Sequence, residues 1–229
     1  MVDQVSNKHF ENLLECFGKL TVRSSDFDEL KEFLNNHYET PEILIRGVEK
    51  QNESIVKLLL DQQLDINYQD DKGNTVLHYE ARSCCDNRLN LLLEHKADVE
   101  ILNNEKMTAV QMAVLSGTVQ NYETLAKVTS DQYRKCKSNK TLLHLAVIGG
   151  NHQLIEKFSK NVEMRNLKND DGETPLCLAA KHGNTNTMQT IMFPFEHCDV
   201  PCKISITAIM NALKSGKKEN YTFLIKYID

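Results

Sequence analysis

The side chains with the most obvious potential for chemistry gather in two irregular stretches of a 229-residue chain. In the later stretch, His197, Cys198 and Cys202 could supply three ligands to zinc. A closed zinc site needs four ligands, so the fourth would have to come from elsewhere, such as Cys177 or His182. The simpler interpretation is a loop in which the thiols and the imidazole merely pack, and no cofactor is expected.

The earlier stretch places Glu80 four residues before Cys84, which Cys85 follows. A carboxylate and a thiol, with a histidine, could form a nucleophilic site. The chain has no glycine-rich phosphate loop, no His-Glu-x-x-His, no Gly-x-Ser-x-Gly and no kinase signature. We therefore expect a protein that is not an enzyme. The alternative is an enzyme or zinc-binding module built on the irregular second repeat or on the 193–202 finger, both of which are defined below.

Composition indicates which elements must position these residues. The chain is 41% hydrophobic and 26% charged, with no Trp, 4 Pro and 9 Gly, which favours a soluble helical protein over an all-β fold. Its 7 cysteines are an odd number, and the N-terminus lacks the apolar stretch of a secretory signal. We expect free thiols, no membrane segment and a cytoplasmic location.

A repeat of 33 residues organises most of the chain. A threonine followed by six mainly apolar residues recurs every 33 residues. These threonines are Thr75, Thr108, Thr141, Thr174 and Thr207, and Glu42 takes the same place one step earlier. Periods of this length are typical of stacked helical repeats, so the sequence predicts six units.

Each unit predicts two helices. The threonine can cap the first helix, and nine residues later comes a glycine able to end it in the left-handed conformation. These glycines are Gly117, Gly150, Gly183 and Gly216. A second apolar segment then predicts an outer helix that packs on the first. These segments are 56–60, 89–93, 154–158 and 221–225.

The motifs within each unit resemble those of ankyrin-repeat proteins. Residues 73–78 read Gly-Asn-Thr-Val-Leu-His, residues 91–100 read Leu-Leu-Leu-Glu-His-Lys-Ala-Asp-Val-Glu, and residues 64–67 read Leu-Asp-Ile-Asn. The resemblance covers residues 39–229 and implies a mainly α solenoid of helix pairs with short β-hairpin fingers and a concave face that binds proteins. Residues 39–229 would then be six ankyrin repeats, the last acting as a C-terminal cap.

Residues 1–38 do not continue the period. Two helical patterns, roughly from Val5 to Leu20 and from Ser25 to His37, predict a helical N-terminal cap with a polar outer face. The alternative is a separate recruiting module such as an F-box, although the chain shows no Leu-Pro-led pattern of that kind.

Three side chains depart from or match the family pattern inside the stack. The resemblance places His78 and His144 where a ring hydrogen-bonds between neighbouring units. Glu80 stands where the other units have Gly47 or alanine. A carboxylate there must reach water, find a partner or take up a proton, so we expect Glu80→Ala to be neutral or stabilising.

The resemblance also implies which side chains meet a partner, namely those at the finger tips and those seven and eight residues after each threonine. The candidates are Asp71, Lys72, Asn74, Arg82, Asn104, Glu105, Met107, Leu115, Arg134, Lys135, Lys137, Lys140, Asp170, Asp171, Glu173, Lys181, His182 and Lys214. The same rule adds Ile148 and Gly149 in the fourth unit.

Charge suggests what that partner is. Residues 1–114 carry a net charge of −9 and residues 115–229 a net charge of +4, within an overall −5. An acidic protein without aromatic side chains between its basic ones is a poor nucleic-acid binder. We expect a monomer that binds a protein through an acidic segment, with no nucleic acid and no membrane. It would serve as an inhibitor, an adaptor or a host-directed effector, the last in the host cytosol or nucleus.

Overall fold

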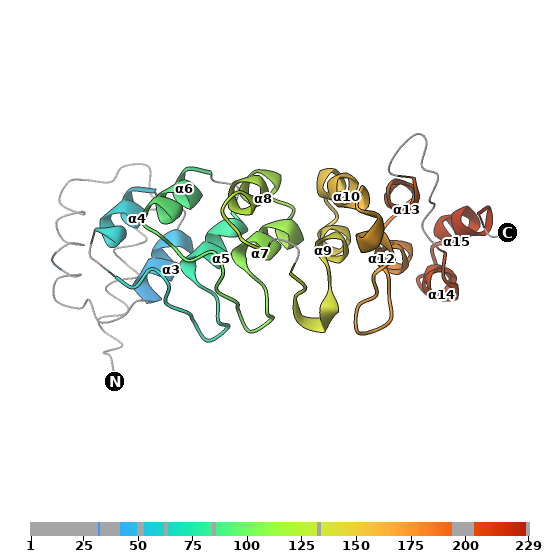
Figure 1. Ribbon diagram of the computed structural model, residues 1–229, viewed down its shortest axis with the longest axis horizontal. Coiled ribbons are helices and arrows are strands. Elements are labelled where there is room, and N and C mark those ends of the chain that lie inside the picture. The colour runs from blue at the N-terminus through green and yellow to red at the C-terminus, as the bar shows by residue number, and fades with distance from the viewer. Residues whose placement is uncertain are drawn as a thin grey trace. The chain divides into compact units, whose positions relative to one another are not determined.

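A computed structural model of the protein describes residues 32, 42–49, 53–61, 64–83, 86–131, 134–193 and 204–227. This part of the chain is built of helices and contains no strand. Two compact units divide the chain, Met1–Asn104 and Glu105–Asp229. In each unit, helices that follow one another in sequence pack as pairs, as the repeat predicts (Figure 1).

The first unit contains two of these pairs. Its helices are α3 (Glu42–Glu49), α4 (Glu53–Leu60), α5 (Val76–Ala81) and α6 (Asp86–Glu94). The inner helices α3 and α5 pack on each other, as do the outer helices α4 and α6. Buried leucines fill the space between them, including Leu44, Leu59, Leu77 and Leu92.

The second unit continues the same plan. Its helices are α7 (Ala109–Ser116), α8 (Val119–Ala126), the 3-10 turn η1 (Lys137–Asn139), α9 (Leu142–Gly149), α10 (His152–Ser159), α11 (Val162–Asn166), α12 (Pro175–His182), α13 (Thr185–Met192), α14 (Ile206–Lys214) and α15 (Lys218–Ile225). The inner helices α7, α9, α12 and α14 pack in that order, and each packs on the outer helix that follows it. The predicted outer helices at 154–158 and 221–225 are therefore confirmed as α10 and α15.

Helix ends follow the predicted rules with two corrections. Gly117 and Gly150 end α7 and α9 in the left-handed conformation, with φ of 75° and 73°. Gly183 does not, because its φ is −79° and it leaves α12 in an extended conformation. Thr207 does not cap the last inner helix either. Ser205 begins α14 two residues earlier and accepts from the Ala208 N–H at 3.3 Å.

The fingers are the loops that precede the inner helices, at residues 67–74, 101–107, 134–140 and 167–173. They were expected to be β-hairpins, but the described residues close as turns. In the first finger the Asp70 N–H donates to the Asn74 carbonyl at 3.0 Å, and the Asp70 carboxylate accepts from the Asn74 N–H at 2.8 Å. The Asp70 side chain thus accepts the hydrogen bond that the Asp70 carbonyl would accept in a hairpin.

The short helix α11 was not predicted. Asn161 caps it by accepting from the Met164 N–H at 3.0 Å, and Glu163 and Arg165 lie in its first and last turns. An asparagine cap with charges of this order is a recognisable start signal.

Candidate protein-binding surface

In α7, α9 and α12, the residue three positions after the cap contacts the next repeat. In α9 the His144 Nδ1 accepts from the Thr141 N–H at 3.2 Å and from the Thr141 hydroxyl at 2.8 Å. The other ring nitrogen, Nε2, then carries the proton and donates to the Glu173 carbonyl at 3.1 Å. Burial lowers the pKa of His144, so the neutral ring that makes these three bonds is the stable form at neutral pH.

Other side chains perform the same task in the neighbouring repeats. In α7 the Gln111 Oε1 accepts from the Thr108 N–H at 3.1 Å, and its Nε2 donates to the Arg134 carbonyl. In α12 the Cys177 thiol lies 3.3 Å from the Ser205 hydroxyl. Cys177 thus makes a polar contact to the next repeat at the position where other repeats have histidine or glutamine, and these contacts support the fold.

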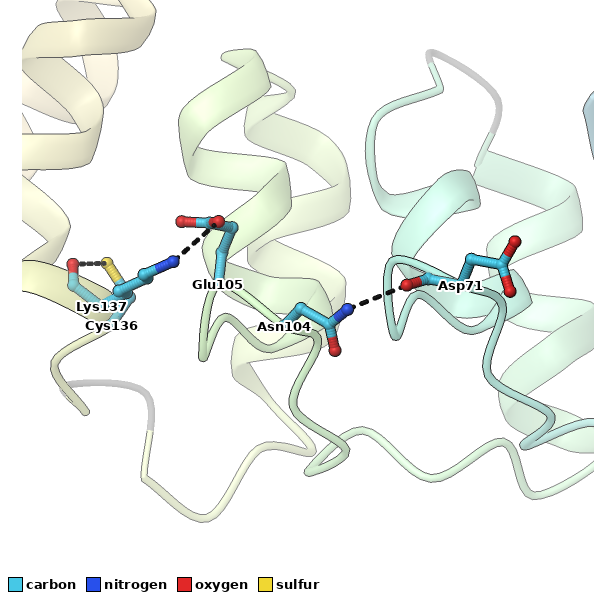
Figure 2. A network of polar contacts seen from close by, with 5 residues as sticks. All are labelled: Asp71, Asn104, Glu105, Cys136 and Lys137. Carbon is cyan, nitrogen blue, oxygen red and sulfur yellow. Dashed lines mark hydrogen bonds and ion pairs between the residues drawn. The ribbon is translucent and has the colours of Figure 1, made fainter.

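Neighbouring fingers are linked by backbone and side-chain bonds (Figure 2). In the first unit the Asn104 N–H donates to the Lys72 carbonyl at 3.0 Å, and the Asn104 side chain donates to the Asp71 carbonyl at 2.9 Å. In the second unit the Lys137 N–H donates to the Glu105 carbonyl at 3.0 Å. These bonds fix the loops relative to one another, so little ordering of the finger tips would be needed for a ligand to bind there.

Most of the candidate side chains are accessible. Those exposed are Asp71, Lys72, Arg82, Asn104, Glu105, Lys135, Lys137, Asp170, Asp171, Lys181, His182 and Lys214, and those half-buried are Leu115, Arg134, Lys140 and Glu173. Asn74 and Met107 are buried, so they are removed from the candidate surface. Asn74 faces inward because its Oδ1 accepts from the Asn103 amide at 2.9 Å.

Part of the finger at residues 134–140, whose basic side chains are Arg134, Lys135, Lys137 and Lys140, is paired within the chain. The Lys137 ammonium lies 3.3 Å from the Glu105 carboxylate, and the Arg134 guanidinium lies 3.9 Å from Asp131. Both pairs are exposed, so each contributes at most about 1 kcal/mol to stability. They nevertheless lower the positive field of this finger, and the sequence alone overestimated its charge.

Four accessible side chains lie on successive inner helices of the second unit. They are Leu115, Ile148, Lys181 and Lys214, each seven residues after its repeat's threonine. The inner helices that carry them pack consecutively, so these positions form a row, called here the inner-helix row. The row is apolar in α7 and α9 and basic in α12 and α14.

Gly149, which the same rule placed beside Ile148, is exposed but has a structural role. A Cβ atom at this position would lie 2.3 Å from the Leu115 carbonyl oxygen, closer than real Cβ atoms come to any neighbour. The absence of a side chain therefore lets α9 approach the end of α7. Gly149 is better explained by helix packing than by partner binding.

The Glu80 carboxylate has a buried partner. Its Oε1 lies 3.0 Å from Arg88 Nη2, its Oε2 accepts from Arg88 Nε at 3.1 Å, and both side chains are almost fully buried. The same guanidinium donates to the Ser83 hydroxyl at 2.8 Å. The Glu80–Arg88 contact joins α5 to α6, so Glu80 is better explained as a link between these helices than as a reactive group. Cys84 and Cys85 lie outside the described residues.

The described part of the chain shows neither a cluster of metal ligands nor a helix that could span a membrane. No group of three or more His, Cys, Asp or Glu side chains is arranged there to hold a metal ion. His197, Cys198 and Cys202 lie outside it. No described helix combines the length and the apolar character needed to cross a bilayer.

Cys136 and Cys177 are buried free thiols, and burial raises the pKa of Cys136.

Comparison with known families agrees with the helix pairs and their spacing. The model described as "Ankyrin repeats (3 copies)" matches residues 19–103, 43–136, 127–204 and 143–229. The chain therefore belongs to the ankyrin-repeat family, whose members are protein–protein interaction modules and typically not enzymes. The first match begins within residues 1–38, the segment predicted to be an N-terminal cap.

Individual relatives cover different parts of the chain. The ankyrin repeat protein FPV232 of fowlpox virus (strain NVSL) is 44% identical over 70 residues, which are 30% of this chain and 14% of that protein. The nuclear factor NF-kappa-B p105 subunit of Gallus gallus is 30% identical over 180 residues, 76% of this chain and 18% of that protein. The chain thus spans less than a fifth of either relative.

A solved structure has the same fold over most of the chain. It belongs to the complex of Bd0816, a predatory endopeptidase from Bdellovibrio bacteriovorus, with the immunity protein Bd3460. The likeness has a TM-score of 0.68 and 25% sequence identity, and it covers 81% of this chain and 97% of that one.

Proposed function

We propose that this protein binds an acidic segment of a protein partner on its concave face, through the inner-helix row and the adjacent finger tips, and acts without catalysis. The observation that carries the proposal is the inner-helix row itself. Most other positions of α7, α9 and α12 are buried by stacking, whereas Ile148 is 43% exposed and Lys181 and Lys214 are exposed.

The order of side chains along the row indicates the kind of ligand. Leu115 and Ile148 offer apolar contact, and Lys181 and Lys214 follow on the next two inner helices. A peptide segment could pack an apolar side chain against Leu115 and Ile148, and carboxylates farther along the same segment would then lie near Lys181 and Lys214. Such charges contribute mainly to association rate and specificity, while the apolar contact contributes to affinity.

The relatives support a role in which binding controls another protein. The matching solved chain is part of an endopeptidase–immunity protein complex, and one curated relative is a subunit of a nuclear factor. We propose that the chain acts in the cytoplasm as a monomeric inhibitor, adaptor or host-directed effector. Fowlpox ankyrin proteins among the relatives support the last of these roles.

Comparative capture from cell lysate tests the proposal. The bait proteins would be the wild-type chain, Ile148→Glu and Val162→Glu, the last being a matched control because Val162 is 44% exposed and lies on α11. Proteins retained by wild type and Val162→Glu, but not by Ile148→Glu, would be the partners of the row. If all three baits retain the same proteins, the row does not bind them.

A further inference from the structure

The last inner helix presents a second apolar surface, distinct from the inner-helix row. Ile206, Met210 and Leu213 of α14 are 80%, 44% and 50% exposed. Their spacing of four and three residues places them on one side of the helix. Three exposed apolar side chains along one helix side are more than the scattered ones usual on a protein surface.

The corresponding positions of earlier inner helices are buried. Met210 corresponds to His144 and Cys177, and both of those side chains are 0% exposed. The next repeat covers them, because His144 bonds to the Glu173 carbonyl and Cys177 contacts Ser205. This side of α14 is therefore the surface that, elsewhere in the stack, receives the following helices.

Leu213 repeats the pattern. Its counterparts, Val147 in α9 and Ala180 in α12, are 4% and 0% exposed. The surface of α14 thus has the composition of a stacking interface, yet the described residues leave about half of the Met210 and Leu213 side chains accessible. We call Ile206, Met210 and Leu213 the end face.

The helix pair that carries the end face is rich in exposed lysine. Lys214, Lys218 and Lys226 of the last helix pair are exposed, against a single exposed carboxylate, Glu219, among residues 204–227. Lys217 is already engaged, since its ammonium donates to the His182 and Gly183 carbonyls at 2.8 and 2.7 Å. Residues 204–227, which include the end face, therefore carry a net positive charge.

We propose that the end face binds an amphipathic helix of a partner protein, with apolar residues along one side and Asp or Glu along its margins. A helix is the expected occupant because every equivalent surface in the second unit is covered by helical repeats. An acidic helix complements the three lysines, whereas a second copy of this chain, docked by the same face, would bring two sets of lysines together. The inference goes beyond the concave-face proposal and does not depend on it.

A designed peptide tests the inference directly. The probe is a labelled amphipathic helix of about 18 residues, roughly five turns, with leucines on one side and glutamates elsewhere. Its isomer with lysines in place of glutamates is the charge control. Fluorescence anisotropy would measure the Kd of each peptide for wild type, Leu213→Glu, Met210→Glu and Val128→Glu. Val128 is a matched control because it is 53% exposed and lies just after α8.

The acidic peptide should bind wild type and Val128→Glu equally, and at least about tenfold more weakly to either end-face variant. Binding should weaken between about 0.05 and 0.3 M salt, as expected for exposed charge pairs. A Lys181→Glu variant should bind this peptide like wild type, which separates the end face from the concave face. Circular dichroism and urea midpoints would show whether each variant keeps its fold.

Either of two binding results, or one result on self-association, would overturn the inference. The binding results are equal affinity for the acidic and basic peptides, and affinity unchanged by both end-face variants. The result on self-association is concentration-dependent dimerisation of wild type in sedimentation velocity that Leu213→Glu abolishes, because a second copy would then be the occupant.

Discussion

At the scale of single residues, burial of the Glu80–Arg88 pair reverses an expectation drawn from sequence. Glu80 occupies a position that is otherwise small, and substitution by alanine was expected to be harmless. The structure places Arg88 against it, with only 4% of the Arg88 side chain exposed. Removing the carboxylate would leave a buried guanidinium without its counter-charge, which is more costly than the pair itself.

Glu80→Ala should therefore lower the free energy of unfolding by about 3 kcal/mol, measured by urea denaturation. The double variant Glu80→Ala/Arg88→Leu should recover much of that loss, because it removes both charges and restores apolar volume. A neutral or stabilising Glu80→Ala would show that the pair adds nothing to stability and would reinstate the sequence-based expectation.

His144 gives a pH-dependent prediction. Its folded-state pKa is lowered by burial, so the folded protein keeps a neutral ring at pH values where the unfolded chain takes up a proton. Stability should fall as the pH drops through about 6.5, the ordinary value, toward the lower folded-state value.

His144→Gln tests this by changing only the titrating ring. Gln111 makes the equivalent bonds in the preceding repeat, so glutamine should preserve much of the stability at pH 7.5. The slope of unfolding free energy against pH below about 6.5 should decrease by up to about 1.4 kcal/mol per pH unit. Identical slopes for the two proteins would mean that the buried ring does not resist protonation.

At the scale of elements, the period of 33 residues was sufficient to place most inner and outer helices. Each unit of 33 residues buries one face of an inner helix and one face of an outer helix, so the apolar positions of both helices recur with that period. The cap of α14 was not predictable in the same way. Ser205 and Thr207 are both competent caps, and the choice of Ser205 coincides with its contact to Cys177 in the preceding repeat.

On the candidate surface, repeat position predicted accessibility correctly except where a side chain contacts a residue distant in sequence. Repeat position correctly indicated that Lys181 and Lys214 are accessible. It was wrong for Asn74, whose side chain is held inward by Asn103, 29 residues away. It also missed the pairing of Lys137 with Glu105, because that contact joins two different fingers.

Close helix packing at Gly149 gives a prediction at this scale. Alanine is normally the better helix former by about 1 kcal/mol, but here its methyl group would meet the Leu115 carbonyl oxygen at 2.3 Å. Gly149→Ala should therefore destabilise the protein by about 1–3 kcal/mol, measured by thermal or urea unfolding. Ser116→Ala is the matched control, at the equivalent exposed position of α7, and should change stability by less than about 0.5 kcal/mol. A Gly149→Ala protein as stable as wild type would show that α9 can move away from the end of α7 without loss of stability.

At the scale of the whole molecule, the repeats use most of their buried residues for stacking and leave the finger tips and the inner-helix row accessible. The finger tips and the inner-helix row are available to a partner, and the bonds between fingers hold the tips in place. Affinity for a partner would then require little ordering of the protein itself. Long-range attraction by Lys135, Lys181 and Lys214 would increase the rate of encounter with an acidic segment.

The most direct test of protein binding through this surface is the association rate of a captured partner as a function of salt. The comparison is between wild type, Lys135→Glu/Lys181→Glu and Lys127→Glu, a control in which an exposed lysine next to α8 is reversed. Lys135 is preferred to Lys137 because reversing Lys137 would also create repulsion with Glu105. The double variant should associate about tenfold more slowly at low salt, with a flatter salt dependence and an unchanged urea midpoint, while the control behaves like wild type. Unchanged kinetics for the double variant, together with slower association for Lys127→Glu, would contradict binding at the concave face.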